Sequence, residues 1–492
     1  MKQVLRIIFT SDVHGYFFPT DYNDRNEKPM GLFHIASKFN KDENTLIIDG
    51  GDTLQGSPFT YYCKLKDKPE IISKIMNEVG YDIITIGNHD FNYGYSYFER
   101  YLNSLDADCV CQNCFDSQNK VLFPYKIFTM KNGFKVGVVG CITEFVNFWE
   151  RKENLNGIYI KNVFDSVKQA YMEIKDKVDV SICVYHGGFE CDLNSGETLE
   201  TSGENIGGKI CRELGFDILL TGHQHVGIEG KYFYGTYIVQ NLFNSLSFQE
   251  INIFKEDDEK IINSKMILSK DIEIEDRELP FRDEEDSVQN WLDNVVGYLD
   301  KELFPKSHLE MAVNGSELAD FINKIQIEFS RADISCTSFA NKVTGFPKEV
   351  RIRDVLLTYP FPNTLVVLEI TGKNLKDALE RMAEYFDIKD GNICISERFL
   401  KPKIEHYNFD YFLGVEYDIS YEKNIGERIS NIKVNGNPIE NSQIYKICMN
   451  SYRASGAGGY YMYKNCKVIE KSKEEIFEII VSYIEKLKHK KS

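Results

Sequence analysis

The sequence has few of the features that mark secreted or membrane-bound proteins. Its 492 residues include only 12 cysteines, scattered along the chain, so no disulfide framework is expected. No run approaches the roughly 20 apolar residues that a membrane-spanning helix needs. The N-terminal segment MKQVLRIIFTSDVHG has neither the apolar core of a signal peptide nor a small-residue cleavage site. We therefore expect a cytoplasmic protein with no membrane partner.

Positive charge is also scarce. Lys and Arg total 58 against 75 Asp and Glu, which gives a formal net charge of −17. Such a chain lacks the diffuse attraction to phosphates that supports binding to long DNA or RNA. A small molecule is therefore the expected partner, and any phosphate that the protein handles needs bound cations. At roughly 100–200 residues per domain, the length predicts more than one domain, and we expect a monomer or a weak oligomer.

The first half of the chain alternates short apolar runs with amphipathic stretches, the pattern of an α/β domain. Six runs predict strands: VLRIIFT, TLIIDG, DIITIG, KVGVVG, VSICVY and DILLTG. Acidic, amide or imidazole side chains directly follow five of them. Because functional groups of α/β sheets gather beyond the carboxyl ends of strands, we expect these side chains to converge.

A charged segment followed by an acidic, helix-like stretch predicts a boundary between two domains. We expect one domain over residues 1–275, a linker with a connecting helix over 276–305, and a second α/β domain over 306–492. The helix itself is predicted over 283–303. In the second domain SELADFINKIQIEF and KNLKDALERMAEYF predict helices, TLVVLEIT and QIYKICM predict strands, and residues 471–490 predict an amphipathic helix.

The residue types at the strand ends suit a pair of divalent ions, which together bind a phosphoryl group and activate water near neutral pH. The candidate ligands are Asp12, His14, Asp52, Asn88, His186, His223 and His225. Asp52, in GGDT, is the natural bridging carboxylate. Each motif alone is more typical of a turn or a core histidine. Five of the 9 histidines, however, fall in this ordered series of motifs.

A second candidate group is the cysteine cluster CVCQNC, formed by Cys109, Cys111 and Cys114. Such a cluster suggests zinc binding or redox chemistry. No second CxxC or nearby histidine completes a four-ligand set, so a structural role is the favoured interpretation.

The segments TSDVHG, DGGDT, GNHD, YHGG and TGHQH resemble the five motifs of the calcineurin-like metallophosphoesterases. The resemblance implies that one ion is held by Asp12, His14, Asp52 and His225, and the other by Asp52, Asn88, His186 and His223. It also implies that His89 stabilises the transition state or protonates the leaving group. Mixed nitrogen and oxygen ligation suits Mn, Zn, Fe or Co, and two Mn or Zn ions are the expected cofactors.

The segments GFPKEVRIRDVLLTYPFPNTLVVLEITGKNLKDALE and NSYRASGAGGY are similar to the C-terminal domain of the 5′-nucleotidase family. The resemblance covers nearly the whole chain. It implies an α/β fold in which a calcineurin-like domain, with two sheets flanked by helices, is joined by a helix to a C-terminal α/β substrate-binding domain. There two aromatic rings clamp a nucleobase: Phe409 and Tyr452 match them, and Tyr407 competes for the first position. Core packing of these rings is the alternative. Asn363 and Gly458 are further expected substrate contacts.

Two departures narrow the resemblance. Asn92, in GNHDFNYG, stands where 5′-nucleotidases pair the catalytic histidine with aspartate, so we place Asn92 with His89 among the catalytic residues. Gly458, in GAGGY, stands where they have an aspartate that would repel a phosphate on the ribose 2′ and 3′ oxygens. The NGGGxR stretch of that family is also replaced by SCTSFANKVTGF. These departures resemble the 2′,3′-cyclic-nucleotide 2′-phosphodiesterase/3′-nucleotidase branch.

The resemblance implies a hydrolase that opens 2′,3′-cyclic nucleotides to 3′-nucleotides and dephosphorylates these to nucleosides at the same site. Closure about the connecting helix is expected to accompany turnover. Two alternatives stay open: a 5′-nucleotidase or UDP-sugar hydrolase, and an inactive nucleotide-binding sensor. The complete ligand set speaks against the sensor.

Overall fold

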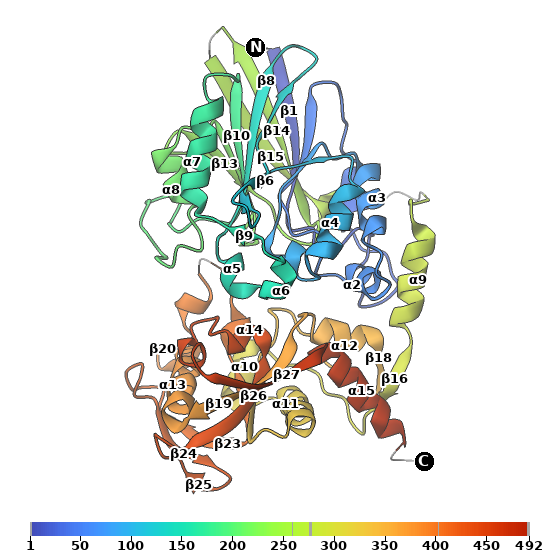
Figure 1. Cartoon of the computed structure of the whole chain (residues 1–492). Coiled ribbons are helices and arrows are strands. Elements are labelled where there is room, and N and C mark those ends of the chain that lie inside the picture. Colours follow the sequence, from blue (N-terminus) through green and yellow to red (C-terminus); the bar gives the residue numbers. More distant parts are fainter. Residues whose placement is uncertain (1, 258, 275–277, 402, 490–492) are drawn as a thin grey trace. The chain divides into compact units, whose positions relative to one another are not determined.

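Short segments rich in β-branched residues form two six-stranded sheets in the first part of the chain (Figure 1). In order across the first sheet the strands are β15 (Glu259–Leu268), β14 (Ser247–Glu256), β1 (Lys2–Thr10), β2 (Thr45–Asp49), β3 (Ile83–Ile84) and β4 (Asp108–Cys109). Across the second they are β12 (Ile228–Phe233), β13 (Thr236–Gln240), β11 (Ile218–Thr221), β10 (Val180–His186), β8 (Lys135–Ile142) and β7 (Lys126–Thr129). A small third sheet contains β6 (Val121–Phe123), β5 (Cys111–Phe115) and β9 (Tyr159–Ile160).

The computed structural model describes residues 2–257, 259–274, 278–401 and 403–489. The chain divides into two compact units, Met1–Gln289 and Asn290–Ser492. The division falls inside the helix α9 (Arg282–Leu292), within the segment predicted as linker and connecting helix. In the described part of the chain, no helix combines the length and the apolar character that crossing a membrane requires.

The core of the first unit lies between its two large sheets. One cluster of buried side chains joins Ile7 and Ile48 of the first sheet to Val138 and Ile182 of the second. At about 25 cal/mol per Å² of apolar surface removed from water, this contact is the main term that holds the sheets together.

Helices α7 (Val163–Ile174) and α8 (Gly207–Glu213) cover the other face of the second sheet (Figure 1). The remaining helices of this unit are α1 (Leu32–Ala36), α2 (Pro58–Leu65), α3 (Pro69–Val79), α4 (Tyr95–Asn103), α5 (Val146–Trp149) and α6 (Lys152–Leu155). The predicted arrangement of two sheets flanked by helices is confirmed.

Parallel pairing sets the strand ends that matter for the site. In the first sheet β1 runs parallel to β2, and β2 to β3. In the second sheet β10 runs parallel to both β8 and β11. The carboxyl ends of these strands therefore lie at one edge of each sheet, as predicted from the polar residues that follow them.

The second unit is built on a five-stranded sheet with the order β22 (Tyr411–Leu413), β17 (Ile334–Thr337), β26 (Ile444–Asn450), β19 (Thr364–Thr371) and β27 (Lys467–Glu475). Three smaller sheets pair β16 (Val295–Tyr298) with β18 (Glu349–Arg351), β20 (Phe386–Lys389) with β21 (Asn392–Ile395), and β23 (Val415–Ile419) with β24 (Ile429–Val434) and β25 (Asn437–Pro438). Its helices are α10 (His308–Asn314), α11 (Glu317–Ser330), α12 (Ile352–Thr358), α13 (Gly372–Ala383), α14 (Ser451–Ala454) and α15 (Ile476–His489). The predicted helices and strands of this half are present as α11, α13, β19 and β26.

Two helix predictions extend too far. The connecting helix predicted over 283–303 ends at Leu292, and β16 follows it because Val295–Tyr298 pairs with β18. The helix predicted over 471–490 begins only at Ile476, because the preceding residues belong to β27, which pairs with β19; residue 490 of this prediction lies outside the described residues. In both segments a pairing partner distant in the sequence overrides the local helical spacing.

Candidate metal centre

The predicted ligands lie where strands of the two large sheets end. After the first sheet's strands come Asp12 and His14 beyond β1, Asp52 beyond β2, and Asn88 at the start of the 3₁₀ helix Asn88–Phe91. From the second sheet, His186 ends β10, and His223 and His225 follow β11. Among the described residues, two groups of His, Cys, Asp and Glu have ligand atoms within 4.8 Å of one another: Asp12, His14, His225, and Asp12, Asp52, His186. The structure therefore brings together residues more than 200 positions apart in the sequence.

The spacing of the first group fits a shared metal ion. Nε2 of His14 lies 3.2 Å from Nε2 of His225, which lies 3.3 Å from Oδ1 of Asp12. Two ligand atoms that are each about 2.1 Å from one ion lie about 3.0–3.4 Å apart at octahedral or tetrahedral angles. The spacing of these two imidazole nitrogens and the carboxylate oxygen therefore matches that of atoms that could share one cation.

The second set of ligands has the same spacing. Oδ1 of Asn88 lies 3.2 Å from Nε2 of His186 and 2.9 Å from Nδ1 of His223. Oδ2 of Asp52 lies 3.2 Å from Nε2 of His186 and 3.9 Å from Nε2 of His14. One carboxylate oxygen of Asp52 therefore lies between a histidine of each set, as a ligand shared by two ions would.

Backbone carbonyls fix the tautomers of two histidines. Nδ1–H of His14 donates to the carbonyl oxygen of Gln55 at 2.9 Å, and Nδ1–H of His186 donates to that of Gly50 at 2.7 Å. A proton on Nδ1 leaves the lone pair of a neutral imidazole on Nε2, the atom that faces the other ligands. Such outer hydrogen bonds orient metal-binding histidines and raise their basicity.

His223 is held the opposite way round. Its Nε2–H donates to Oε1 of Glu204 at 2.9 Å, so Nδ1 carries the lone pair toward Asn88. The ring also stacks on Trp149 with ring centres 5.5 Å apart. Sequence reasoning missed Glu204, and no motif around it signals the contact.

The loops that carry the ligands are held in a demanding backbone conformation. Positive φ angles occur at five of the seven ligands: Asp12 (55°), His14 (50°), Asp52 (62°), His223 (69°) and His225 (59°). Left-handed conformation at a residue other than glycine costs on the order of 1 kcal/mol and marks functional sites. Gly87 permits the closest approach of two of these loops, because a Cβ there would overlap Oδ1 of Asp52.

Asp90 organises the loop that carries Asp52. Its buried carboxylate accepts the backbone N–H groups of Gly87, Asp52, Thr53 and Leu54. Burial raises the pKa of Asp90, while these N–H donors act in the opposite direction. This role of Asp90 was not predicted from the sequence, although the residue lies inside the GNHD motif.

Burial and neighbouring charges shift the pKa values of the candidate ligands in different directions. Burial alone would raise the pKa of Asp52, but the imidazoles of His186, His89 and His14 hold it well below its usual range. Burial lowers the pKa of His14 to about 4. Burial also acts to lower the pKa of His186, but Asp52, Asp12 and the Gly50 carbonyl together more than offset this and raise it to about 10. A metal ion must displace a proton from His186, so metal binding weakens as the pH falls.

His89 lies beside the ligands. Its backbone N–H donates to Oδ1 of Asp52 at 2.7 Å, and its ring meets that of His14 edge to face at 5.4 Å. Nδ1 of His89 lies 2.7 Å from Oδ1 of Asn92. The structure thus brings the two predicted catalytic residues together, with the amide next to the ring.

The predicted base-stacking residues differ in exposure. The ring of Phe409 is only 4% exposed and packs against Tyr385, Phe386 and Tyr411, with ring centres 4.8, 5.6 and 4.9 Å away. Tyr407 is half-buried. Phe409 thus has the surroundings of a core residue, and exposure favours the competing candidate Tyr407.

A buried ion pair organises the segments around these candidates. Nε of Arg453 lies 2.9 Å from Oδ2 of Asp410, and both side chains are 1% exposed. The same guanidinium donates to the carbonyl oxygens of Tyr407 at 2.9 Å and Ala457 at 2.7 Å, and lies 5.9 Å from the ring centre of the half-buried Tyr452.

The two other predicted substrate contacts lie in the same unit. Oγ of Ser451, next to Tyr452, donates to Oδ1 of Asn363 at 3.1 Å. Gly458 has φ +67°, and a Cβ there would overlap Oδ1 of Asn408 and Nη1 of Arg453. The space that an aspartate would need at this position is therefore filled by other side chains.

In the part of the chain that the structure describes, the cysteine cluster stands apart from the groups placed to hold a metal ion. Neither of the two candidate metal groups among the described residues contains a cysteine. Cys111 and Cys114 are buried, and their mutual contact and burial raise the pKa of Cys114. This pattern fits a packed, unreactive thiol.

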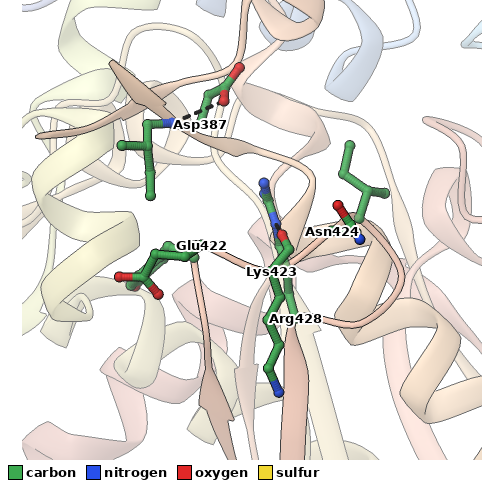
Figure 2. Close-up of a pocket in the computed structure, with 8 residues that line it drawn as sticks. Asp387, Glu422, Lys423, Asn424 and Arg428 are labelled. Atoms are coloured by element: carbon green, nitrogen blue, oxygen red, sulfur yellow. Dashed lines mark hydrogen bonds between the residues drawn. The ribbon is translucent and has the colours of Figure 1, made fainter. Parts of the chain in front are cut away.

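A hollow of about 560 Å³ lies in the second unit (Figure 2). Its lining is Asp387, Ile388, Tyr421, Glu422, Lys423, Asn424, Ile425 and Arg428. The Arg428 guanidinium donates to the carbonyl oxygens of Lys423, Ala383 and Phe386, so its hydrogen bonds hold the backbone. The strand-end ligands all belong to the first unit, so the hollow is not part of the metal centre.

Comparisons with known proteins agree with this architecture. The family model of the calcineurin-like phosphoesterases matches residues 5–227, and that of the 5′-nucleotidase C-terminal domain matches residues 295–465. A trifunctional nucleotide phosphoesterase of Bacillus subtilis is 25% identical over 98% of this chain, which spans only 38% of that protein. A 2′,3′-cyclic-nucleotide 2′-phosphodiesterase/3′-nucleotidase of Salmonella typhimurium is 24% identical, with 92% of this chain and 81% of the relative covered.

A solved structure gives a higher identity. A Staphylococcus aureus protein assigned as a 5′-nucleotidase, solved in complex with α-ketoglutarate, is 32% identical with a TM-score of 0.93. The match covers 98% of this chain and 96% of that one. Together with the two domain matches and the strand-end ligands, this likeness establishes that the chain belongs to the 5′-nucleotidase family of calcineurin-like, metal-dependent phosphoesterases.

Proposed function

We propose that the chain hydrolyses 2′,3′-cyclic nucleotides to 3′-nucleotides and then dephosphorylates these to nucleosides. The observation that carries the proposal is the combination of seven metal-type ligands at coordination spacing with Gly458, which has no carboxylate and where an added Cβ would overlap the side chains of Asn408 and Arg453. Without that carboxylate, a phosphate on the 2′ and 3′ oxygens meets no repulsion there. Relatives with this activity in their names, such as the Salmonella protein, support the proposal.

The donor set fits two divalent ions. Asp12, His14 and His225 would hold one, Asn88, His186 and His223 the other, and Asp52 both. When bound, such ions activate water and neutralise phosphate charge. Nitrogen and oxygen donors without thiolate suit Mn or Zn, which we propose as the metals.

The protein's own groups position and protonate the substrate. The backbone N–H of His89 donates to Asp52 and its ring lies against that of His14, and we assign to Nε2 of this ring the proton given to the departing ribose 2′ oxygen as the P–O bond breaks. Water supplies the new oxygen on phosphorus, which leaves a 3′-monophosphate. A half-buried aromatic ring, Tyr407 or Tyr452, would stack on the base and tolerate different bases.

One observation favours a second candidate. The Staphylococcus aureus protein that is 32% identical is assigned as a 5′-nucleotidase. A 5′-nucleotidase would prefer a phosphate on the 5′ oxygen, and Gly458 would then leave the ribose hydroxyls without a carboxylate partner. The complete ligand set argues against an inactive nucleotide sensor.

The test compares 2′,3′-cyclic AMP, 3′-AMP and 5′-AMP as substrates of the Mn- or Zn-reconstituted protein. We expect kcat/KM for the first two to exceed that for 5′-AMP, and the activity to vanish with the metals. His89→Ala should keep the metal content and lose about 10²–10⁴-fold in rate. A preference for 5′-AMP would establish the second candidate, and metal-dependent activity on none of the three would reject a nucleotide substrate.

The cytoplasmic location and the monomeric or weakly associating state stay predictions. Gel filtration with light scattering tests the second. A stable dimer at micromolar concentration would contradict it.

A further inference from the structure

A chain of hydrogen bonds leads from His89 away from the ligands. Nδ1–H of His89 donates to Oδ1 of Asn92 at 2.7 Å, and Nδ2 of Asn92 donates to Oε2 of Glu150 at 2.7 Å. Oε1 of Glu150 accepts Nδ2–H of Asn154 at 2.8 Å and the N–H of Arg151 at 2.7 Å. The four side chains in this hydrogen-bond network come from two segments, residues 89–92 and 150–154, and all are partly buried.

The direction of each hydrogen bond follows from the carboxylate. An ionised Glu150 can only accept, so the NH₂ group of Asn92 must face it. The amide oxygen of Asn92 must then face His89. An oxygen opposite Nδ1 requires a proton on Nδ1, which leaves Nε2 as the ring nitrogen that exchanges a proton with a substrate.

The carboxylate itself has fixed partners. The side chain of Asn154, in α6, and the backbone of Arg151 both donate to the oxygen that points away from Asn92. Nδ2 of Asn154 also donates to the carbonyl oxygen of Asn92 at 3.0 Å, which ties the segment of Glu150 to that of His89. A carboxylate with three donors in this arrangement is held in one orientation.

We propose that Glu150 is a positioning residue that sets the amide orientation of Asn92 and, through it, the Nδ1–H tautomer of His89. An aspartate at position 92 would place its carboxylate directly against His89. In this chain Glu150 supplies a carboxylate that acts on His89 through the amide of Asn92. This inference rests on the proposed function, because it assigns His89 the transfer of its Nε2 proton to the leaving oxygen. Water from solvent returns the proton to Nε2.

The first test exchanges the two functional groups. Asn92→Asp alone places two carboxylates opposite each other at the 2.7 Å contact. Glu150→Gln alone places its new NH₂ group opposite another donor, either the NH₂ group of Asn92 or the N–H groups of Asn154 and Arg151. The double variant Asn92→Asp/Glu150→Gln restores one donor and one acceptor at each contact. We expect each single variant to lose about 10–100-fold in kcat, typical of lost outer partners, and the double variant to recover most of the loss.

The second test separates positioning from stability by the leaving group. Expulsion of 4-nitrophenolate needs little protonation, whereas phenolate needs an acid. Glu150→Gln should therefore lower kcat/KM for phenyl phosphate much more than for 4-nitrophenyl phosphate, at unchanged metal content. The exposed Glu153→Gln is the matched control and should change neither. Equal losses on both substrates, or a double variant as poor as the singles, would overturn the inference.

A third readout does not need turnover. In protein labelled with ¹⁵N-histidine, with His89→Gln identifying the signal, the wild type should show the proton of neutral His89 on Nδ1. Glu150→Gln should shift this population toward Nε2. An unchanged tautomer would overturn the inference, while a shift together with a 5′-AMP preference would reject only the proposed substrate.

Discussion

Exposure separates the two aromatic residues that compete for the first base-stacking position. Tyr407 is half-buried, whereas Phe409 is 4% exposed inside a cluster of rings. Tyr407→Ala should raise KM for 3′-AMP by the factor that corresponds to the loss of one base stack, roughly 1–3 kcal/mol. KM for 4-nitrophenyl phosphate should stay unchanged. Phe409→Ala should lower the free energy of unfolding by about 3–5 kcal/mol. A Phe409→Leu variant that folds normally and selectively loses nucleotide affinity would contradict this assignment.

Gly458 carries a steric requirement that can be measured. A side chain there would overlap Asn408 and Arg453, whereas Gly436, at φ +75°, has nothing within 4 Å of its Cβ position. Both Gly→Ala variants are destabilised by the positive φ, so the difference between their losses of unfolding free energy measures the effect of the overlap. We expect Gly458→Ala to lose about 1–3 kcal/mol more than Gly436→Ala in denaturant unfolding. Equal losses would mean that Asn408 and Arg453 can move aside, so a side chain could be accommodated at position 458. The overlap would then no longer support the proposed substrate preference.

At the scale of elements, the convergence of the candidate ligands could be predicted because they lie at or just beyond the ends of strands. A run such as DILLTG ends where β11 ends, so His223 and His225 must leave the sheet at its carboxyl edge. Glu150 and Glu204 could not be predicted, since their roles depend on contacts with residues 58 and 19 positions away that no local spacing encodes.

The fold shows the same division between local and distant information. Strand segments such as TLVVLEIT have a strong intrinsic preference and were predicted correctly as β19. Residues after Leu292 continue a helical spacing of apolar side chains, yet Val295–Tyr298 pairs with Glu349–Arg351 about 50 residues later. Local periodicity carries no record of such a partner, so helix ends were the least predictable feature.

Helix α9 contains a pH-sensitive carboxyl group. Glu285 is buried against Tyr22 and Gln289, and burial raises its pKa from 4.5 to about 7 although both neighbours donate hydrogen bonds. Because the pKa of Glu285 is raised in the folded state, its contribution to the free energy of unfolding is fully present below pH 4.5. This contribution is lost as the pH rises through 7. Glu285→Gln should therefore gain up to about 3 kcal/mol relative to the wild type between pH 4.5 and 8. Thermal melts across this range, with the exposed Asp283→Asn as control, test it; parallel curves would contradict the assignment.

At the scale of the whole molecule, the two units have different reasons to be stable. The first, Met1–Gln289, contains all seven ligands, with positive φ at five of them and buried carboxylates that need cations. The second has its own sheet and none of these ligands. Metal ions that bind only the folded state stabilise it in proportion to the logarithm of the ratio of their concentration to Kd. Metal loss is therefore a perturbation of one unit.

Chelation should expose this difference in calorimetry. With metal at about 1,000 times its Kd, binding adds about 4 kcal/mol to the stability of the first unit, so EDTA should lower that unit's Tm and leave the second unit's transition in place. Hydrogen exchange assigns each transition to its residues, with faster exchange expected around β1, β2 and β11. His186→Asn should show a low first transition with or without EDTA, because Asn88 and Asp52 lose their shared co-ligand. An EDTA shift confined to the second unit would place the metals elsewhere.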